Sequence, residues 1–250
     1  IGKVVHYRGG KLKMKKITLV ILSALVFLLG MNVQETGAAA ESHVVFYVPH
    51  QDDDTLTMGV AIRNHINAGH NVHVVMLTDG AALFVRKKMG MSAEDFTEAR
   101  NKEFELAMTA LGVDEDNIDY RSFSDGSLQI RQVKSVIREY EAMYPNAKHK
   151  AYSYTDTNED HSDSGEALRQ LSSVGEVTDA RYYVRRGTAA PKGKTLLTER
   201  LYAKDRPAMR NASTAYKTQD TSKGLYGIGY RSVKASFDTF DKLPQSRYHK

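Results

Sequence analysis

The chain alternates short apolar runs with longer stretches in which apolar residues recur every three or four positions. Residues 44–48 and 72–77 are mostly apolar runs, which is typical of strands buried in a parallel sheet. Further strands are expected at residues 118–123 and 151–154. Helical spacing is found at residues 58–68, 92–111, 127–143 and 164–173. Strands that alternate with helices predict an α/β fold with a mostly parallel sheet and right-handed crossovers.

The pattern changes after residue 180, where three stretches look extended and are separated by proline, glycine and lysine. They are residues 181–185, 195–202 and 225–233, and residues 208–218 have helical spacing. We therefore expect a β-rich C-terminal segment. Residues 41–250 are long enough for one sizeable α/β core, so a single domain is predicted.

The first forty residues look like an export signal rather than part of the fold. Basic residues at 14–16 are followed by thirteen uncharged, mostly apolar residues at 17–29, and then by small residues that end at Ala40. This order is that of a secretory signal peptide, and the apolar run is short for a membrane span, which needs about twenty residues. We expect residues 14–40 to be a signal peptide cleaved after Ala40, and residues 1–13 to be an upstream mis-start. The mature protein would then be secreted, with no stable membrane span.

Composition narrows the chemistry further. The chain has no cysteine, which excludes disulfides and thiolate zinc ligands, so any metal must be held by His, Asp or Glu. In residues 41–250 the basic and acidic residues are equal in number, which removes the main support for nucleic-acid binding. They are unevenly distributed, because residues 41–180 carry 13 bases and 24 acids while residues 181–250 carry 16 bases and 5 acids. Either the two segments neutralise each other where they touch, or the basic segment contacts an anionic polymer.

A polar cluster follows the first predicted strand directly. Its sequence is Pro49-His50-Gln51-Asp52-Asp53-Asp54. In open parallel sheets, ligands bind at the carboxyl ends of the strands. Acids packed this closely repel one another unless a counter-charge is present, and a divalent cation would supply one. The alternative is a helix N-terminus enriched in acids, which accounts for Asp53 and Asp54 but not for His50.

A second polar cluster, residues 155–161, follows the fourth predicted strand and precedes a helix. Both clusters are therefore expected at the same edge of the sheet. Together the two clusters can offer two histidines, His50 and His161, and one aspartate to a single ion. Three protein ligands with a fourth position open to water are the arrangement of catalytic zinc sites.

In these residues, and in their order, the sequence resembles the PIG-L/LmbE-like zinc-dependent N-deacetylases, which act on N-acetylglucosaminyl and related groups. The first cluster is similar to that family's A-H-P-D-D-E motif. Further resemblances follow in chain order at Thr78-Asp79-Gly80, Arg100-Asn101-Lys102-Glu103, Asp125-Gly126-Ser127-Leu128 and Arg210-Asn211-Ala212. The resemblance implies a Rossmann-like sheet with helices on both faces. It also implies one ion of zinc, or of another divalent metal, per chain, with His50 and Asp53 as ligands and Asp52 as general base.

Two alignments compete for the third metal ligand, which the family takes from an H-P-D-H motif. Matching residues 161–164 to that motif would place Ser164 at the ligand position. Matching residues 158–161 keeps His161 as the ligand and also aligns the glycine and leucine that follow with the family's G-x-A-L. We prefer the second alignment. It puts Asn158 where the family has an oxyanion-stabilising histidine, and an amide can donate a hydrogen bond there but cannot supply a proton.

Three further residues are expected to support the site. Asp160 lies beside the third ligand. Arg100 belongs with Glu103, one helical turn away, either to a pair that supports the site or to a plain intrahelical pair. Asp79 either orients a metal ligand or is a turn residue.

The expected function is a secreted, zinc-dependent hydrolase that removes N-acetyl groups from the amino sugars of a glycan or glycoconjugate, with Asp52 and Asn158 as catalytic residues. One alternative is a non-catalytic sugar-binding protein of the same fold, which Asn158 favours and Asp52 disfavours. Another is a phosphatase of the haloacid-dehalogenase type, suggested by Asp52-x-Asp54. Leu56 and the residues between the strand and Asp52 disagree with that motif.

Overall fold

The structure, a computed structural model, describes residues 42–250, so the predicted upstream residues and signal peptide lie outside its range. Seven strands form one sheet in the order β3-β2-β1-β4-β5-β9-β6. The first five are parallel and are β1 (His43–Val48), β2 (Asn71–Thr78), β3 (Ile118–Phe123), β4 (Lys148–Tyr152) and β5 (Asp179–Val184). The antiparallel strands at the edge are β6 (Leu197–Thr198) and β9 (Arg247–His249). The predicted, mostly parallel Rossmann-like sheet is confirmed.

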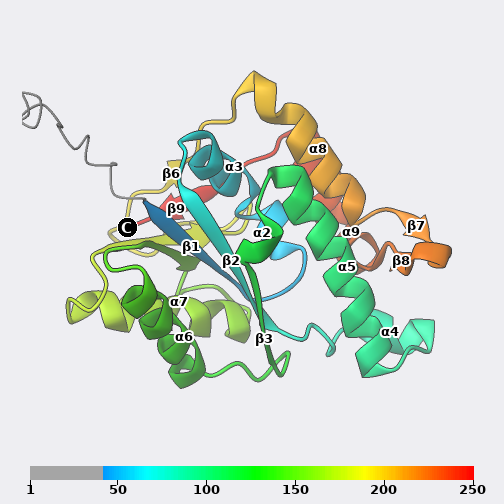
Figure 1. Cartoon of the computed structure of the whole chain (residues 1–250), viewed down its shortest axis with the longest axis horizontal. Helices are drawn as coiled ribbons and strands as arrows, with labels where there is room; N and C mark the ends of the chain where they lie inside the picture. The colour runs from blue at the N-terminus through cyan, green and yellow to red at the C-terminus, as the bar shows by residue number, and fades with distance from the viewer. Residues whose placement is uncertain (1–41) are drawn as a thin grey trace, which may run out of the picture. The chain divides into compact units, whose positions relative to one another are not determined.

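Helices cover both faces of this sheet (Figure 1). One face is covered by α3 (Gly59–Asn67), α5 (Ala93–Leu111), α8 (Arg206–Ala215) and α9 (Ile228–Lys242). The other face is covered by α6 (Ile130–Met143) and α7 (Glu159–Ser173). Because β1 is buried on both faces, it is apolar at consecutive positions. Val44 and Phe46 pack in the first layer, whereas Val45 and Tyr47 pack in the second.

The strand order reverses between β1 and β4. The chain runs from β1 to β2 and β3 on one side, then returns to β4 on the other side of β1. Loops that leave the two central strands diverge at such a point and leave a crevice at the carboxyl edge of the sheet. The first polar cluster follows β1 and the second follows β4, so the topology brings them together.

The remaining elements are short. They are α2 (Asp53–Leu56), α4 (Phe84–Met89), β7 (Gln219–Asp220), β8 (Leu225–Tyr226) and the 3₁₀ helices η2 (Glu115–Asn117), η3 (Ala203–Asp205) and η4 (Thr221–Lys223). The predicted β-rich C-terminal segment is thus supported only in part. The predicted extended stretch at residues 181–185 is the greater part of β5, and four shorter strands follow it, but α8 and α9 hold most of the ordered residues of the segment. Within residues 42–250, no helix has the length and apolarity that a membrane crossing requires.

The extended stretch predicted at residues 225–233 is wrong over most of its length, because α9 begins at Ile228. Gly227 precedes it with φ +66°, a conformation that favours glycine. The backbone N–H groups of Ile228 and Gly229 donate to the carboxylate of Glu103 at 2.7 and 2.9 Å, and Glu103 is fully buried. An acid from α5 thus satisfies the N-terminus of α9. The local alternation of apolar residues gives no sign of this contact.

Candidate metal centre

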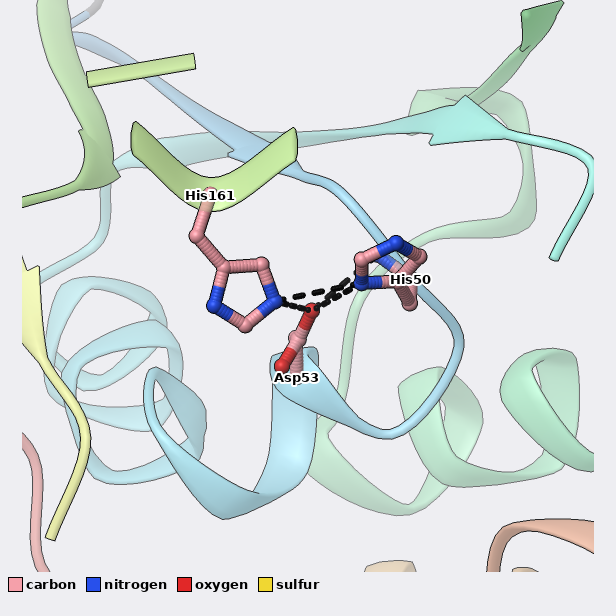
Figure 2. Close-up of side chains that lie close together, drawn as sticks. All are labelled: His50, Asp53 and His161. Carbon is pink, nitrogen blue, oxygen red and sulfur yellow. Dashed lines mark hydrogen bonds and ion pairs between the residues drawn. The ribbon is translucent and has the colours of Figure 1, made fainter. Parts of the chain in front are cut away.

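Three potential ligand atoms meet where the loops after β1 and β4 converge (Figure 2). Nδ1 of His50 lies 3.2 Å from Oδ2 of Asp53 and 3.1 Å from Nε2 of His161. The same His161 nitrogen lies 3.0 Å from that Asp53 oxygen. A tetrahedral ion with bonds of about 2.0–2.1 Å needs ligand atoms about 3.3–3.4 Å apart, so these atoms already stand close to that spacing. Two imidazoles and one carboxylate are also a donor set that suits zinc.

The other ring nitrogen of His50 faces two carboxylates. Its Nε2 lies 3.0 Å from Oδ2 of Asp160 and 3.2 Å from Oδ1 of Asp125. Asp160 also accepts the backbone N–H groups of Gly126 and Leu128. Burial alone would raise the pKa of Asp160, but His50 and these N–H groups lower it. Carboxylates that accept the Nε2 proton leave Nδ1 of His50 available to a cation.

These carboxylates form, with His50, a second group of potential ligand atoms. This second group offers only one nitrogen, and Asp125 already accepts the backbone N–H of Ala82. The first group offers two nitrogens and lies beside Asp52, so it is the better candidate. Asp125 was not expected in the site, although its D-G-x-L motif was a signal that could have found it.

His161 lies in the first turn of α7, which begins five residues earlier than predicted. The side-chain oxygen of Asn158 caps this helix by accepting the backbone N–H of His161 at 3.2 Å. Nδ1 of His161 is 3.4 Å from Asp156 but is not aligned for a hydrogen bond. Ser164, the competing candidate, is buried, and its hydroxyl donates to the carbonyl of His161. The structure therefore brings His161 to the cluster and leaves Ser164 out of it.

Tyr152, at the end of β4, holds two of the three candidate ligands in place. Its hydroxyl donates to Oδ1 of Asp53 at 2.6 Å, and its ring centre lies 4.0 Å from that of His161. With Oδ1 engaged, only Oδ2 of Asp53 faces the histidines. Residue 165 must also be small here, because an added Cβ on Gly165 would lie 2.2 Å from the Tyr152 carbonyl oxygen. Sequence reasoning missed Tyr152, since an aromatic residue in a buried strand is indistinguishable from ordinary core.

Asp52 lies next to the cluster in an unusual backbone conformation, with φ +118°. Burial and the neighbouring charge of Asp53 raise the pKa of Asp52 to about 8, while Arg100 opposes the shift. The buried guanidinium of Arg100 is 3.6 Å from the Asp52 carboxylate and donates to the carbonyls of Gln51 and Gly80. A carboxyl with a pKa near neutrality can both take and return a proton. Arg100 thus lies against Asp52, the predicted general base.

Two other expectations about supporting residues resolve differently. Oδ1 of Asp79 accepts the backbone N–H groups of Ala81 and Asp125, so Asp79 orders a turn and does not orient His50, Asp53 or His161. Glu103 forms no ion pair with Arg100, because its carboxylate binds the start of α9 instead.

Asp54 points into the core and away from the cluster. It is fully buried and accepts hydrogen bonds from the hydroxyls of Tyr216 and Thr55 at 2.6 and 2.7 Å. A haloacid-dehalogenase site would need both carboxylates of Asp52-x-Asp54 to face the substrate. The phosphatase alternative is therefore wrong.

The cluster opens into a cleft of about 750 Å³, a volume in the range of small-molecule sites. The walls of the cleft come from the loops after β1, β4 and β5 and from α9. Asn158 is exposed at the metal end, and its amide nitrogen makes no hydrogen bond to any residue of the described part of the chain. This amide can therefore donate to a ligand in the cleft.

Structural comparison finds the same fold in proteins of different chemistry. A triple mutant of a deacetylase from the teicoplanin biosynthetic pathway is 18% identical, with a TM-score of 0.64 over 83% of this chain and 97% of that one. N,N'-diacetylchitobiose deacetylase from Pyrococcus horikoshii is 16% identical, with a TM-score of 0.58 over 92% and 91%. The 4-carboxy-2-hydroxymuconate hydratase of Pseudomonas putida is 16% identical, with a TM-score of 0.53 over 83% and 95%. Likeness at these identities shows the fold alone.

Sequence comparison is more specific. A search among curated proteins gives no match. The sequence model of the family described as GlcNAc-PI de-N-acetylase, PIG-L, matches residues 45–172, which include both polar clusters and half of the chain. The chain therefore belongs to the PIG-L family.

Proposed function

We propose that this chain is a metal-dependent amide hydrolase that removes the N-acetyl group from an amino sugar. The observation that carries the proposal is the meeting of His50, Asp53 and His161 within 3.2 Å of one another, beside Asp52 at the head of a cleft. Membership of the PIG-L family supports the acetamide as the reacting group. The diacetylchitobiose deacetylase of the same fold supports an amino sugar as its carrier.

His50, Asp53 and His161 would hold one divalent cation, for which zinc is the best candidate. Bound there, the cation would supply Lewis-acid polarisation of the acetamide carbonyl, positive charge and a more acidic water. The residues around it prepare the ligands for this task. Asp125 and Asp160 hold Nε2 of His50, and Tyr152 occupies the second oxygen of Asp53.

Asp52 would take a proton from the attacking water and return it to the leaving nitrogen. Burial and Asp53 favour its protonated form, and Arg100 favours its ionised form, so both are accessible near neutral pH. The amide of Asn158 would donate a hydrogen bond to the negative charge that develops on the carbonyl oxygen. A C–O bond forms and the C–N bond breaks, which yields acetate and a free amine.

We place this activity outside the membrane, and the basis is the sequence of residues 14–40 alone. Its substrates would then be the amino sugars of extracellular glycans or glycoconjugates. A non-catalytic sugar-binding protein is the second candidate, and it is favoured by Asn158, which stands where the resemblance to the family implies an oxyanion-stabilising histidine.

The test is acetate release from N-acetylglucosamine oligomers by the zinc-loaded protein, its Asp52→Asn variant and an Asp116→Asn control. Asp116 is exposed in η2 and does not line the cleft, and its carboxylate makes no hydrogen bond or ion pair within residues 42–250. We expect the parent and the control to release acetate, and Asp52→Asn to be slower by about a thousandfold while still binding zinc. Full activity of Asp52→Asn would refute its role. Sugar binding by a parent protein that releases no acetate would favour the second candidate.

A further inference from the structure

The basic C-terminal segment, residues 181–250, keeps its positive charge after folding. Among the ion pairs of the described chain, one joins a base of this segment to an acid outside it, Arg185 to Asp156. Another joins an acid of the segment, Asp205, to a base outside it, Arg63, so the two pairs cancel in charge. The other acids of the segment pair with bases of the segment itself. Neutralisation between the two parts of the chain, one of the two expectations from the sequence, therefore does not account for the excess of basic residues.

Three of the unpaired bases follow one another closely at the start of α8. They are Lys204, Arg206 and Arg210, and all three are exposed. Their charged groups make no hydrogen bond or ion pair within residues 42–250. The acid between them in the chain, Asp205, is buried, and Arg63 of α3 donates to its carboxylate at 2.9 Å. This α8 basic surface, made of Lys204, Arg206 and Arg210, thus carries three cations that no acid of the described chain neutralises.

The two arginines of this surface border a hollow of about 240 Å³ between α8 and the end of α9. The buried residues that line the hollow are apolar and are Met209, Phe240 and Pro244. The hollow also has one acid, Asp241, which accepts the hydroxyl of Ser213 at 2.6 Å and forms an ion pair with Lys217. Since this carboxylate is already engaged, the hollow combines two free guanidinium groups with an apolar floor.

The spacing of the two arginines is unfavourable for the helix by itself. Arg206 and Arg210 are four positions apart on α8, so they lie on the same face. Like charges at this spacing repel each other and destabilise a helix. An anion bound between them would remove the repulsion. Two such bases without an acidic partner are therefore better explained by an external anion than by the needs of folding.

The dimensions of the hollow indicate what kind of anion fits. Pockets for whole small molecules usually hold about 300–1,000 Å³, so a hollow of 240 Å³ suits a single unit of a longer chain. Guanidinium groups bind phosphate and carboxylate groups in a bidentate manner. Lys204 continues the positive charge beyond the two arginines, so neighbouring anionic units of the same chain would also find a cation. Weak contacts with several linked units add up to a useful affinity.

We propose that the α8 basic surface binds a polymer of repeating anionic units, which carry phosphate or carboxylate groups. None of its three bases lines the cleft that contains the candidate metal ligands. Binding at this surface therefore does not require the proposed amide hydrolysis. It corresponds to the other expectation from the sequence, in which the basic segment contacts an anionic polymer.

The test is the affinity of the protein for linear polyphosphate, for polygalacturonate and for neutral dextran, measured by calorimetry at several salt concentrations. The double variant Arg206→Gln/Arg210→Gln is compared with Lys87→Gln/Arg131→Gln. This control removes the same charge from exposed side chains on α4 and α6 whose charged groups also lack a partner in the described chain.

We expect the parent and the control to bind at least one of the two anionic polymers and not dextran. The Arg206→Gln/Arg210→Gln protein should bind that polymer at least about tenfold more weakly, the scale of one charge-assisted hydrogen bond. For polyphosphate, its plot of log affinity against log salt concentration should be shallower by about 1.4, because two phosphate contacts are lost. Its thermal unfolding temperature should be unchanged or slightly higher, since a repulsion is removed.

The remaining outcomes decide the proposal as clearly. Binding of polyphosphate alone identifies a phosphate surface, and binding of polygalacturonate alone identifies a carboxylate surface. Equal affinity of the parent and Arg206→Gln/Arg210→Gln, or an equal loss in the control, would overturn the assignment. So would a parent that binds neither polymer, including one that binds only vesicles of anionic phospholipid. Acetate release from uncharged N-acetylglucosamine oligomers should be the same in all three proteins, so the proposed function is tested separately.

Discussion

Two regions of the chain build the same cleft in different ways. Residues 42–184 supply the parallel sheet and the candidate metal ligands, which lie in the loops and first helical turns that follow β1 and β4. Residues 185–250 supply the opposite wall, and contacts with the first region position that wall. One such contact joins the buried carboxylate of Glu103 to the start of α9, and another joins Asp54 to Tyr216. This difference indicates that the chemistry depends on local structure, whereas the shape of the substrate-binding wall depends on long-range packing.

The largest predicted effect is a loss of folding stability at acid pH, and it arises in the first region. His65 on α3 is buried beside Phe46, and burial together with the charge of Lys150 lowers the pKa of His65 to about 3. In the unfolded chain histidine takes up a proton near pH 6.5, so each pH unit below that value costs the folded state about 1.4 kcal/mol.

His65→Gln removes this cost. Between pH 7 and pH 4.5, the free energy of unfolding in urea should fall by about 2–3 kcal/mol more in the parent than in the variant. The difference between the two proteins cancels the other titrating groups. Parallel pH profiles for parent and variant would show that His65 is not responsible.

A smaller loss of folding stability should follow when the contact between Glu103 and the start of α9 is weakened. Glu103→Gln replaces a carboxylate that accepts two helix N–H groups by an amide that can accept only through its oxygen. We expect a loss of about 2 kcal/mol in the free energy of unfolding at pH 7. Glu98→Gln is the control, because Glu98 lies on the same helix in an exposed pair with Lys102 and should matter little. An unchanged Glu103→Gln protein would mean that the second region does not depend on this contact.

The smallest change is expected within the metal end itself. Tyr152→Phe frees Oδ1 of Asp53, so this carboxylate could bind a cation through both oxygens. Zinc affinity should fall about tenfold, as for other residues that orient metal ligands, and the visible spectrum of the cobalt-substituted protein should change. Tyr248→Phe on β9 is the control, since its hydroxyl has no hydrogen-bond partner in the described chain. Identical affinity and spectrum in Tyr152→Phe would show that the hydroxyl is dispensable.

Much of the first region is predictable from the sequence because its signals are local. The apolar runs of β1 and β2, and the Ser92 cap of α5, are written in neighbouring residues. The polar clusters after β1 and β4 reveal His50 and His161 for the same reason, whereas the choice of Asp53 among the neighbouring aspartates came from the resemblance to the family's motif. The start of α7 was placed too late, because its first turn faces the site and carries polar residues where a buried helix would carry apolar ones.

What could not be predicted depends on residues far apart in the chain. Tyr152 and Asp125 join the site through single hydrogen bonds across the sheet edge. The start of α9 depends on Glu103, some 125 positions earlier.

Zinc binding at equilibrium tests the central claim most directly. The metal-stripped protein is titrated with zinc beside His161→Ala and Ser164→Ala, the two residues that compete for the third ligand position. The account predicts one high-affinity zinc per chain in the parent and in Ser164→Ala, and loss of that binding in His161→Ala. A parent that binds no zinc, or a His161→Ala variant that binds it as tightly as the parent, would contradict a centre made of His50, Asp53 and His161.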